Sequence, residues 1–137
     1  MATTSSNPAL ASRGENKSIL LLDTDTDYLL ELEQYLKMQG YFTQHIVTVD
    51  DLKNFLLSFL PDVIVCSITI APYLRDIKEK IRGFSTETIP KVLILSNHGA
   101  IEDIRYAMKI GANDCISKTV SPEFIVYVIE AMLETKQ

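Results

Sequence analysis

From Ser18 onward, short runs of apolar residues alternate with longer segments in which apolar residues recur at helical spacing. The runs ILLL, VIVC and VLIL are apolar at consecutive positions, which is typical of strands covered on both faces in a parallel sheet. Apolar residues three and four positions apart between these runs predict amphipathic helices. Strand and helix alternate five times, which predicts an α/β domain.

Glycine and proline mark the same boundaries as the hydrophobic pattern. Three glycines each follow a helical segment, where a left-handed residue commonly ends a helix: Gly40, Gly83 and Gly111. Prolines stand before two predicted strands and at the start of two predicted helices: Pro61, Pro90, Pro72 and Pro122. Right-handed crossovers with helices on both faces favour a doubly wound (βα)5 fold with a parallel five-stranded sheet in the flavodoxin-like order 2-1-3-4-5.

Three of the predicted helices carry an apolar stripe that we expect to face the core. The stripes are Leu52, Phe55, Leu56 and Phe59; Leu74, Ile77 and Ile81; and Ile125, Val128, Ile129 and Met132.

Composition restricts the classes of function. The 137 residues suffice for one domain, which we place at residues 18–137, after a flexible tail at residues 1–17 that is poor in apolar residues. The net charge of −5 offers no general attraction for nucleic acid or an anionic membrane surface. Cys66 and Cys115 lie in apolar runs and read as reduced core residues. We expect a cytoplasmic protein that binds neither nucleic acid nor membrane.

In this fold, ligands bind at the carboxyl ends of the strands, where the strand order reverses. That rule nominates the polar residues that end or follow four strands: Asp23, Thr24, Asp25, Ser67, Ser96 and Lys118. The stretches ILLLDTD, PDVIVCSI, IPKVLILSNHG and GANDCISKTVSPEF contain them. In order and spacing, these stretches resemble the four signature blocks of CheY-like receiver domains of bacterial two-component response regulators, and the resemblance covers residues 18–135.

The resemblance implies a role for each matched position. In receivers, two acidic residues after the first strand and one aspartate after the third hold Mg²⁺, and that third-strand aspartate accepts a phosphoryl group. A hydroxyl after the fourth strand and a lysine after the fifth bind the phosphoryl oxygens. Asp23, Ser96 and Lys118 match this pattern, whereas Thr24 replaces the second acid and Ser67 replaces the phosphoacceptor aspartate.

These two replacements remove the chemistry of the site. Mg²⁺ is held through carboxylates, and a carboxylate nucleophile is needed to form an acyl phosphate. Asp23 is then left facing Lys118, so we expect an ion pair there, with no metal and no cofactor. We expect Asp25 to begin the first helix and point elsewhere, with Thr24 or Asp25 as its cap.

Two further interpretations concern catalysis and switching. Ser67 could act as a nucleophile with His45 or His98 as base, but no G-x-S-x-G elbow surrounds it. A structural serine that caps the loop is the better interpretation, and we predict no enzymatic activity. Receivers place an aromatic switch residue three positions before the lysine. That position is Cys115 here, and a cysteine cannot reproduce the rotation of a ring.

Receivers also use the face formed by the fourth helix, fifth strand and fifth helix to contact partners and to form dimers. On helical projection, Tyr106 and Ile110 face away from Ile104, Ala107 and Met108, and Tyr127 faces away from the core stripe of the last helix. We therefore expect Tyr106, Ile110 and Tyr127 to be exposed on a surface that binds a protein partner or, as a homodimer, a second copy of the chain.

We interpret the chain as a pseudo-receiver of a two-component-type system, a phosphorylation-independent module that acts by protein–protein interaction in bacterial signalling. The alternative is a sensor in which the vacated phosphorylation pocket binds a small molecule or an anion.

Overall fold

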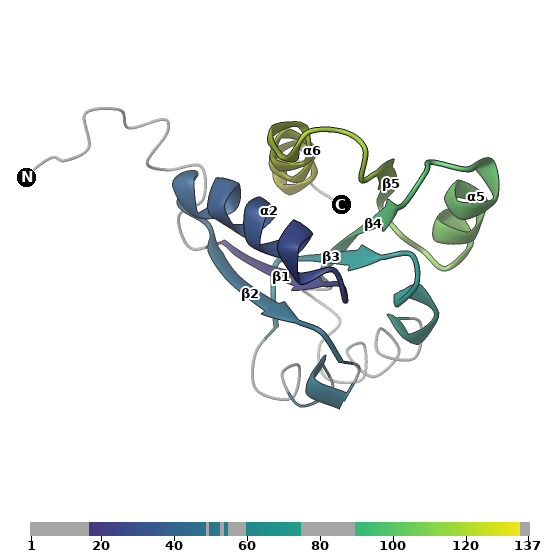
Figure 1. Ribbon diagram of the computed structural model, residues 1–137, viewed down its shortest axis with the longest axis horizontal. Coiled ribbons are helices and arrows are strands. Elements are labelled where there is room, and N and C mark those ends of the chain that lie inside the picture. The colour runs from purple at the N-terminus through teal and green to yellow at the C-terminus, as the bar shows by residue number, and fades with distance from the viewer. Residues whose placement is uncertain (1–16, 49, 53, 55–59, 75–89, 135–137) are drawn as a thin grey trace, which may run out of the picture.

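The computed structural model describes residues 17–48, 50–52, 54, 60–74 and 90–134. Five strands form one parallel sheet in the order β2-β1-β3-β4-β5, as the hydrophobic pattern predicts (Figure 1). The strands are β1 (Ser18–Leu22), β2 (Phe42–Ile46), β3 (Val63–Ser67), β4 (Lys91–Ser96) and β5 (Asp114–Ser117). The reversal of strand order lies between β1 and β3, so polar residues at the carboxyl ends of these strands meet at one edge of the sheet.

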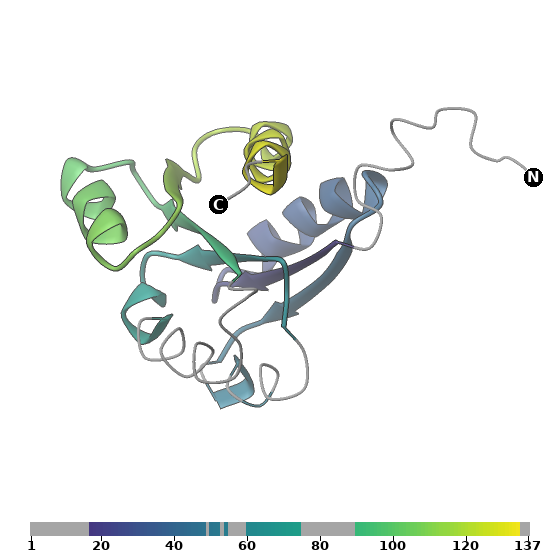
Figure 2. The same cartoon turned by 180° about the vertical axis from the view of Figure 1, so that it is seen from behind.

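Helices cover both faces of this sheet. The helices α2 (Thr26–Met38) and α6 (Pro122–Glu134) lie side by side on one face (Figures 1 and 2). Helix α5 (Ile101–Lys109) contributes Ala107 to the core on the other face, and the helical residues at 50–52 and 71–74 contribute Leu52, Ala71 and Leu74. The fold is therefore the predicted doubly wound one.

The sheet divides the interior into two cores, because successive side chains of a strand point to opposite faces. Ile19 and Leu21 pack with α2 and α6, whereas Leu20 and Leu22 pack on the other face with Leu52. Every residue of β1 and β3 is buried. Strands of this kind need no alternation of polar and apolar residues, which explains the continuous apolar runs in the sequence.

The predicted stripe of the last helix is confirmed: Ile125, Ile129 and Met132 are buried, and Val128 packs against the core. Leu52 and Leu74 are also buried. The remaining members of the other two stripes, Phe55, Leu56, Phe59, Ile77 and Ile81, lie outside the described residues, as do Gly83 and residues 1–16 of the predicted tail. Gly40 and Gly111 both have φ of +91°, as expected for glycines that follow a helix.

Candidate functional site

The predicted pocket residues gather at the carboxyl edge of the sheet. Asp23 directly follows β1, while Ser67 and Ser96 end β3 and β4. Ser96 is paired in register with Ser117, the last residue of β5, and Lys118 comes next. Thr24 is exposed on the loop that leads into α2. The topology therefore brings together the residues that the sequence nominates, with Thr24 at the rim.

Asp23 and Lys118 form the ion pair that the sequence predicts. The Asp23 side chain is only 4% exposed and that of Lys118 only 13%, so the pair is shielded from water. The other carboxylate oxygen of Asp23 accepts a hydrogen bond from the Asp25 backbone N–H at 3.1 Å. The Lys118 backbone N–H donates to the Ser96 carbonyl at 2.8 Å, which fixes the lysine to the end of β4. The two opposite charges at the centre of the site are thus paired with each other.

Tyr28 of α2 forms the wall beside the lysine. The Lys118 ammonium lies 5.0 Å from the centre of the Tyr28 ring, within the range of a cation–π contact. Burial, together with the negative charges of Asp23, Glu31 and Asp25, raises the pKa of the Tyr28 hydroxyl to about 12. Tyr28 therefore stays neutral at physiological pH and shields one side of the ammonium. Sequence reasoning missed this residue, although it stands in the first turn of the helix that follows Asp23.

Asp25 caps α2, as one of the two predicted alternatives has it. Its carboxylate accepts a hydrogen bond from the Tyr28 backbone N–H at 3.2 Å. The Asp25 carboxylate therefore stabilises the amino terminus of α2, where the helix dipole also favours negative charge. The Asp25 side chain is exposed at this terminus.

Ser67, which we expected to cap the loop after its strand, is hydrogen-bonded within that loop. Its side chain is buried at 2% exposure, and its hydroxyl lies 3.0 Å from the hydroxyl of Thr69. The Thr69 backbone N–H also donates to Ser67 Oγ at 3.3 Å, which closes a local serine turn. His45 lies on the outer strand beside Glu33, and His98 is on an exposed loop. Neither histidine is among the hydrogen-bond partners of Ser67 found in the described residues.

The same turn occurs at the end of β5. Ser117 Oγ lies 2.7 Å from Thr119 Oγ1 and accepts from the Thr119 backbone N–H at 3.1 Å. Thr69, Ser117 and Thr119 were not nominated from the sequence, yet the repeated Ser-x-Thr pattern at two strand ends was a usable signal. The two turns place uncharged hydroxyl groups at the carboxyl ends of β3 and β5.

Ser96 positions the loop after β4. It is fully buried, and its hydroxyl accepts from the Gly99 backbone N–H at 2.7 Å. Gly99 has φ of +69°, and a Cβ atom there would lie 3.4 Å from the Cβ of Ser117. The loop is therefore held closely against the end of β5, and the hydroxyl of Ser96 is already used to hold it.

Cys115, the predicted switch position, is half-buried in β5 and packs against the core on the face that includes α5. Burial raises the pKa of its thiol, and the nearby Asp103 and Asp114 raise it further. Burial likewise raises the pKa of the Cys66 thiol. Both thiols are therefore protonated at neutral pH, and neither forms a disulfide.

The predicted orientation of α5 is wrong. Tyr106 and Ile110 are half-buried and pack against the core, with the buried Ala107 between them along the chain. The residues expected inside, Ile104 and Met108, are 39% and 45% exposed. The physical reason is that α5 carries apolar residues around most of its circumference, so periodicity alone did not identify its inner face. Tyr127 is exposed on α6 as expected, at 67%.

The exposed apolar surface of α5 and α6 is therefore made of different residues from those predicted. It comprises Ile101, Ile104 and Met108 on α5, and Phe124 and Tyr127 on α6. We call these five residues the α5–α6 surface.

No group of three or more His, Cys, Asp or Glu side chains in the described part of the chain is arranged to hold a metal ion. None of its helices has both the length and the apolar character needed to cross a bilayer.

Comparisons with known proteins agree with the fold. No family model matches the chain. The CheY-like receiver domain protein from Methanospirillum hungatei superposes with a TM-score of 0.71 and 21% identity, over 86% of this chain and 94% of that one. HP1043, an orphan response regulator of H. pylori, gives 0.73 and 23% identity over 88% and 99% of the two chains. The chain thus has the fold of response-regulator receiver domains.

The chain is also similar in sequence to a bacterial regulatory protein. The chain is 28% identical to the photosynthetic apparatus regulatory protein RegA of Rhodobacter capsulatus over 109 residues. The match covers 79% of this chain but 58% of RegA, so the chain spans little more than half the length of this relative.

Proposed function

We propose that the chain is a pseudo-receiver, a signalling module of the two-component type that works without aspartyl phosphorylation and acts by binding other proteins. The observation that carries this proposal is the buried ion pair between Asp23 and Lys118. In receivers the corresponding groups serve the metal and the phosphoryl group, whereas here they neutralise each other. The position of the phosphoacceptor holds Ser67, whose hydroxyl is engaged with Thr69.

The regulatory role draws on the relatives. RegA carries the name of a regulatory protein, and the superposed structures are receiver domains and response regulators. In our proposal the chain keeps the receiver fold as a surface that other proteins recognise. It does not keep the receiver chemistry, because the residues that perform this chemistry are replaced at two positions.

The alternative of an anion sensor has less support. An anion that binds the Lys118 ammonium group would have to displace the Asp23 carboxylate from the ion pair. Removing one partner from a buried pair costs about 3–5 kcal/mol. A neutral ligand could instead bind the hydroxyl groups of Ser67, Thr69, Ser117 and Thr119. A melting-temperature screen with small polar metabolites tests this alternative, since a bound ligand raises the melting temperature.

Incubation of the protein with acetyl phosphate and Mg²⁺ tests phosphorylation independence. We expect the intact mass to remain that of the unmodified chain, because no carboxylate stands at the position of Ser67 to form an acyl phosphate. A receiver domain with an intact acidic triad, treated in parallel, is the positive control. A labile adduct of one phosphoryl group on this chain would contradict the proposal.

The interaction mode is tested on the α5–α6 surface. Replacing Ile104 and Tyr127 with Ser is expected to weaken partner binding about tenfold or more, because apolar and aromatic anchors dominate interfaces. Both side chains are exposed, so the melting temperature should hardly change. The readout is the set of proteins that immobilised wild-type and variant chains retain from extracts of the native organism.

Leu30→Ser is the matched control, because Leu30 is an apolar residue on α2 that is 49% exposed. Tyr106→Ser is unsuitable as a test of binding, since Tyr106 packs against the core and its loss would destabilise the fold. Equal retention by the wild type and the Ile104 and Tyr127 variant would remove the support for this surface.

A further inference from the structure

Strand β2 is the outermost strand of the sheet and pairs with β1 alone among the described strands. The Phe42 backbone N–H donates to the Lys17 carbonyl at 3.0 Å, on the β1 side. In a parallel ladder the direction of the backbone groups alternates, so those of Thr43 and His45 point away from β1. These outward-directed groups form a hydrogen-bonding edge that can accept a further strand.

The side chains of β2 do not block such pairing. Proteins usually protect an edge strand with lysine, proline or a bulge. The sequence of β2 is FTQHI, which contains neither lysine nor proline. Its register with β1 runs without interruption from Phe42 to Ile46, so the strand has no bulge. The edge is therefore regular and free of the residues that normally prevent association.

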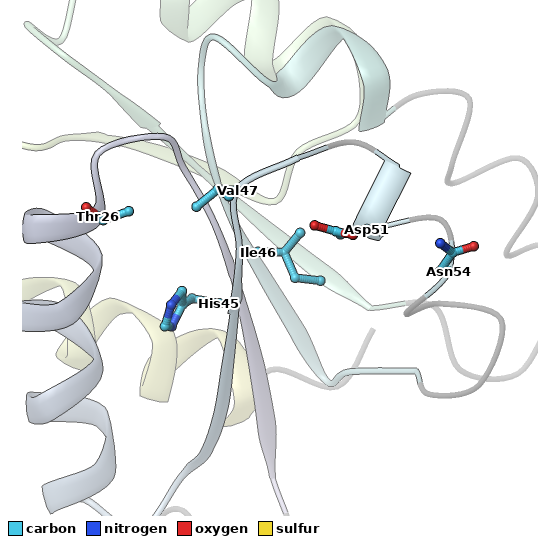
Figure 3. Close-up of a pocket in the computed structure, with 6 residues that line it drawn as sticks. All are labelled: Thr26, His45, Ile46, Val47, Asp51 and Asn54. Atoms are coloured by element: carbon cyan, nitrogen blue, oxygen red, sulfur yellow. The ribbon is translucent and has the colours of Figure 1, made fainter.

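A groove of about 710 Å³ lies at the carboxyl end of β2. Figure 3 shows His45 and Ile46 directed to opposite sides of the strand, with Asp51 and Asn54 beyond Ile46. The contacts agree: His45 faces Glu33 of α2, whereas Ile46 packs against the core on the other face of the sheet. The groove therefore extends around the edge of β2, and an occupant that fills it must lie along that edge.

We propose that β2 pairs antiparallel with β2 of a second copy of this chain, forming a continuous ten-stranded sheet around a two-fold axis at Gln44. In this register Thr43 lies opposite His45 of the other copy, and the outward backbone groups of both meet as hydrogen-bonded pairs. Phe42 lies opposite Ile46. The Phe42 side chain is 59% exposed, and Ile46 lines the groove, so each copy places an aromatic ring at the groove of the other.

The charges at the ends of β2 favour the antiparallel orientation. Lys17 and Lys37 lie near its amino end, and Asp50 and Asp51 follow its carboxyl end. All four residues are exposed. An antiparallel partner sets the basic end of each copy beside the acidic end of the other, whereas a parallel partner would set like charges together. The α5–α6 surface remains accessible, because β5 lies at the opposite edge of each sheet.

Cysteine cross-linking at the axis tests this register. Gln44 would face itself at a pair without hydrogen bonds, where Cα atoms are about 4.5 Å apart, which suits a disulfide. Under mild oxidation we expect Gln44→Cys to form a dimer at least roughly tenfold faster than Gln34→Cys, because pairing raises the effective concentration of the thiols. Gln34 is an exposed glutamine on α2, so it controls for random collision, and the wild-type chain controls for Cys66 and Cys115.

Sedimentation of the unmodified chain over a wide concentration range provides the second measurement. We expect a concentration-dependent species with twice the mass of the 15.4 kDa chain. Gln44→Lys should abolish this species by placing two ammonium groups together at the axis, whereas Gln34→Lys, with the same change in net charge, should not. Equal cross-linking of the two cysteine variants, or a dimer that Gln44→Lys leaves intact, would overturn the proposed pairing.

Discussion

Replacing Lys118 with Met is expected to lower the free energy of unfolding by about 3 kcal/mol or more. Met keeps the apolar stem of the lysine but removes the ammonium group. Asp23, which is only 4% exposed, would then be a buried carboxylate without its cation. The loss of the contact with the Tyr28 ring adds to the effect. Urea unfolding followed by circular dichroism measures the change, provided the transition remains two-state.

A double-mutant cycle separates the ion pair from the other contacts of Lys118. Combining Asp23→Asn with Lys118→Met removes both charges, so the double variant should recover most of the stability lost by Lys118→Met alone. Lys109→Met is the matched control, because Lys109 is exposed at the end of α5 and its loss should cost less than about 1 kcal/mol. Similar losses for Lys109→Met and Lys118→Met would mean that the buried pair has no special role in stability.

The pairing of Asp23 with Lys118 could be predicted because it depends mainly on strand order. Once the apolar runs are recognised as buried parallel strands, the ends of β1 and β5 must lie at the same edge of the sheet. Thr24 and Ser67 carry no charge, so Asp23 and Lys118 are the charged residues among the positions matched to the receiver pattern. Few side-chain details enter this inference, which explains why the structure agrees with it.

The orientation of α5 could not be predicted in the same way. Its sequence and the residue after it, IEDIRYAMKI, contain apolar residues on several sides of the helix. A helical projection therefore allows more than one inner face, and packing against β4 and β5 selects among them. The inner face that results carries Tyr106 and Ile110, which pack against the core. The hydrogen-bonded turns at Ser67 and Ser117 depend similarly on local backbone geometry, which a pattern of apolar residues does not describe.

Replacing Thr24 and Ser67 together with aspartate is expected to create a Mg²⁺ site. The two introduced carboxylates would join Asp23 at the carboxyl edge of the sheet, and three carboxylates are a donor set that suits this ion. Lys118 can balance only one of them, so the double variant should be less stable than the wild type without metal. Mg²⁺ at 100 times its dissociation constant should then restore about 2.7 kcal/mol of stability, seen as a rise in melting temperature.

The same variant should react with acetyl phosphate. A carboxylate at position 67 is a nucleophile that can attack phosphorus and form an acyl phosphate, with acetate as the leaving group. We expect an increase in intact mass of one phosphoryl group, dependent on Mg²⁺ and lost after treatment with hydroxylamine. Thr24→Asp alone should gain no adduct, because Ser67 would remain. Ser67→Asp alone should bind Mg²⁺ more weakly than the double variant does.

These outcomes distinguish a modified pocket from a modified fold. If the double variant folds and gains both Mg²⁺ binding and the labile adduct, the two replaced acids account for the missing chemistry, and the rest of the pocket remains competent. If it folds but gains neither, then the hydrogen-bonded turn at Thr69 or the position of Tyr28 must also exclude the metal. In that case the pocket has departed from receiver geometry beyond the two substituted positions, and interaction through the surface of the domain becomes the better supported function.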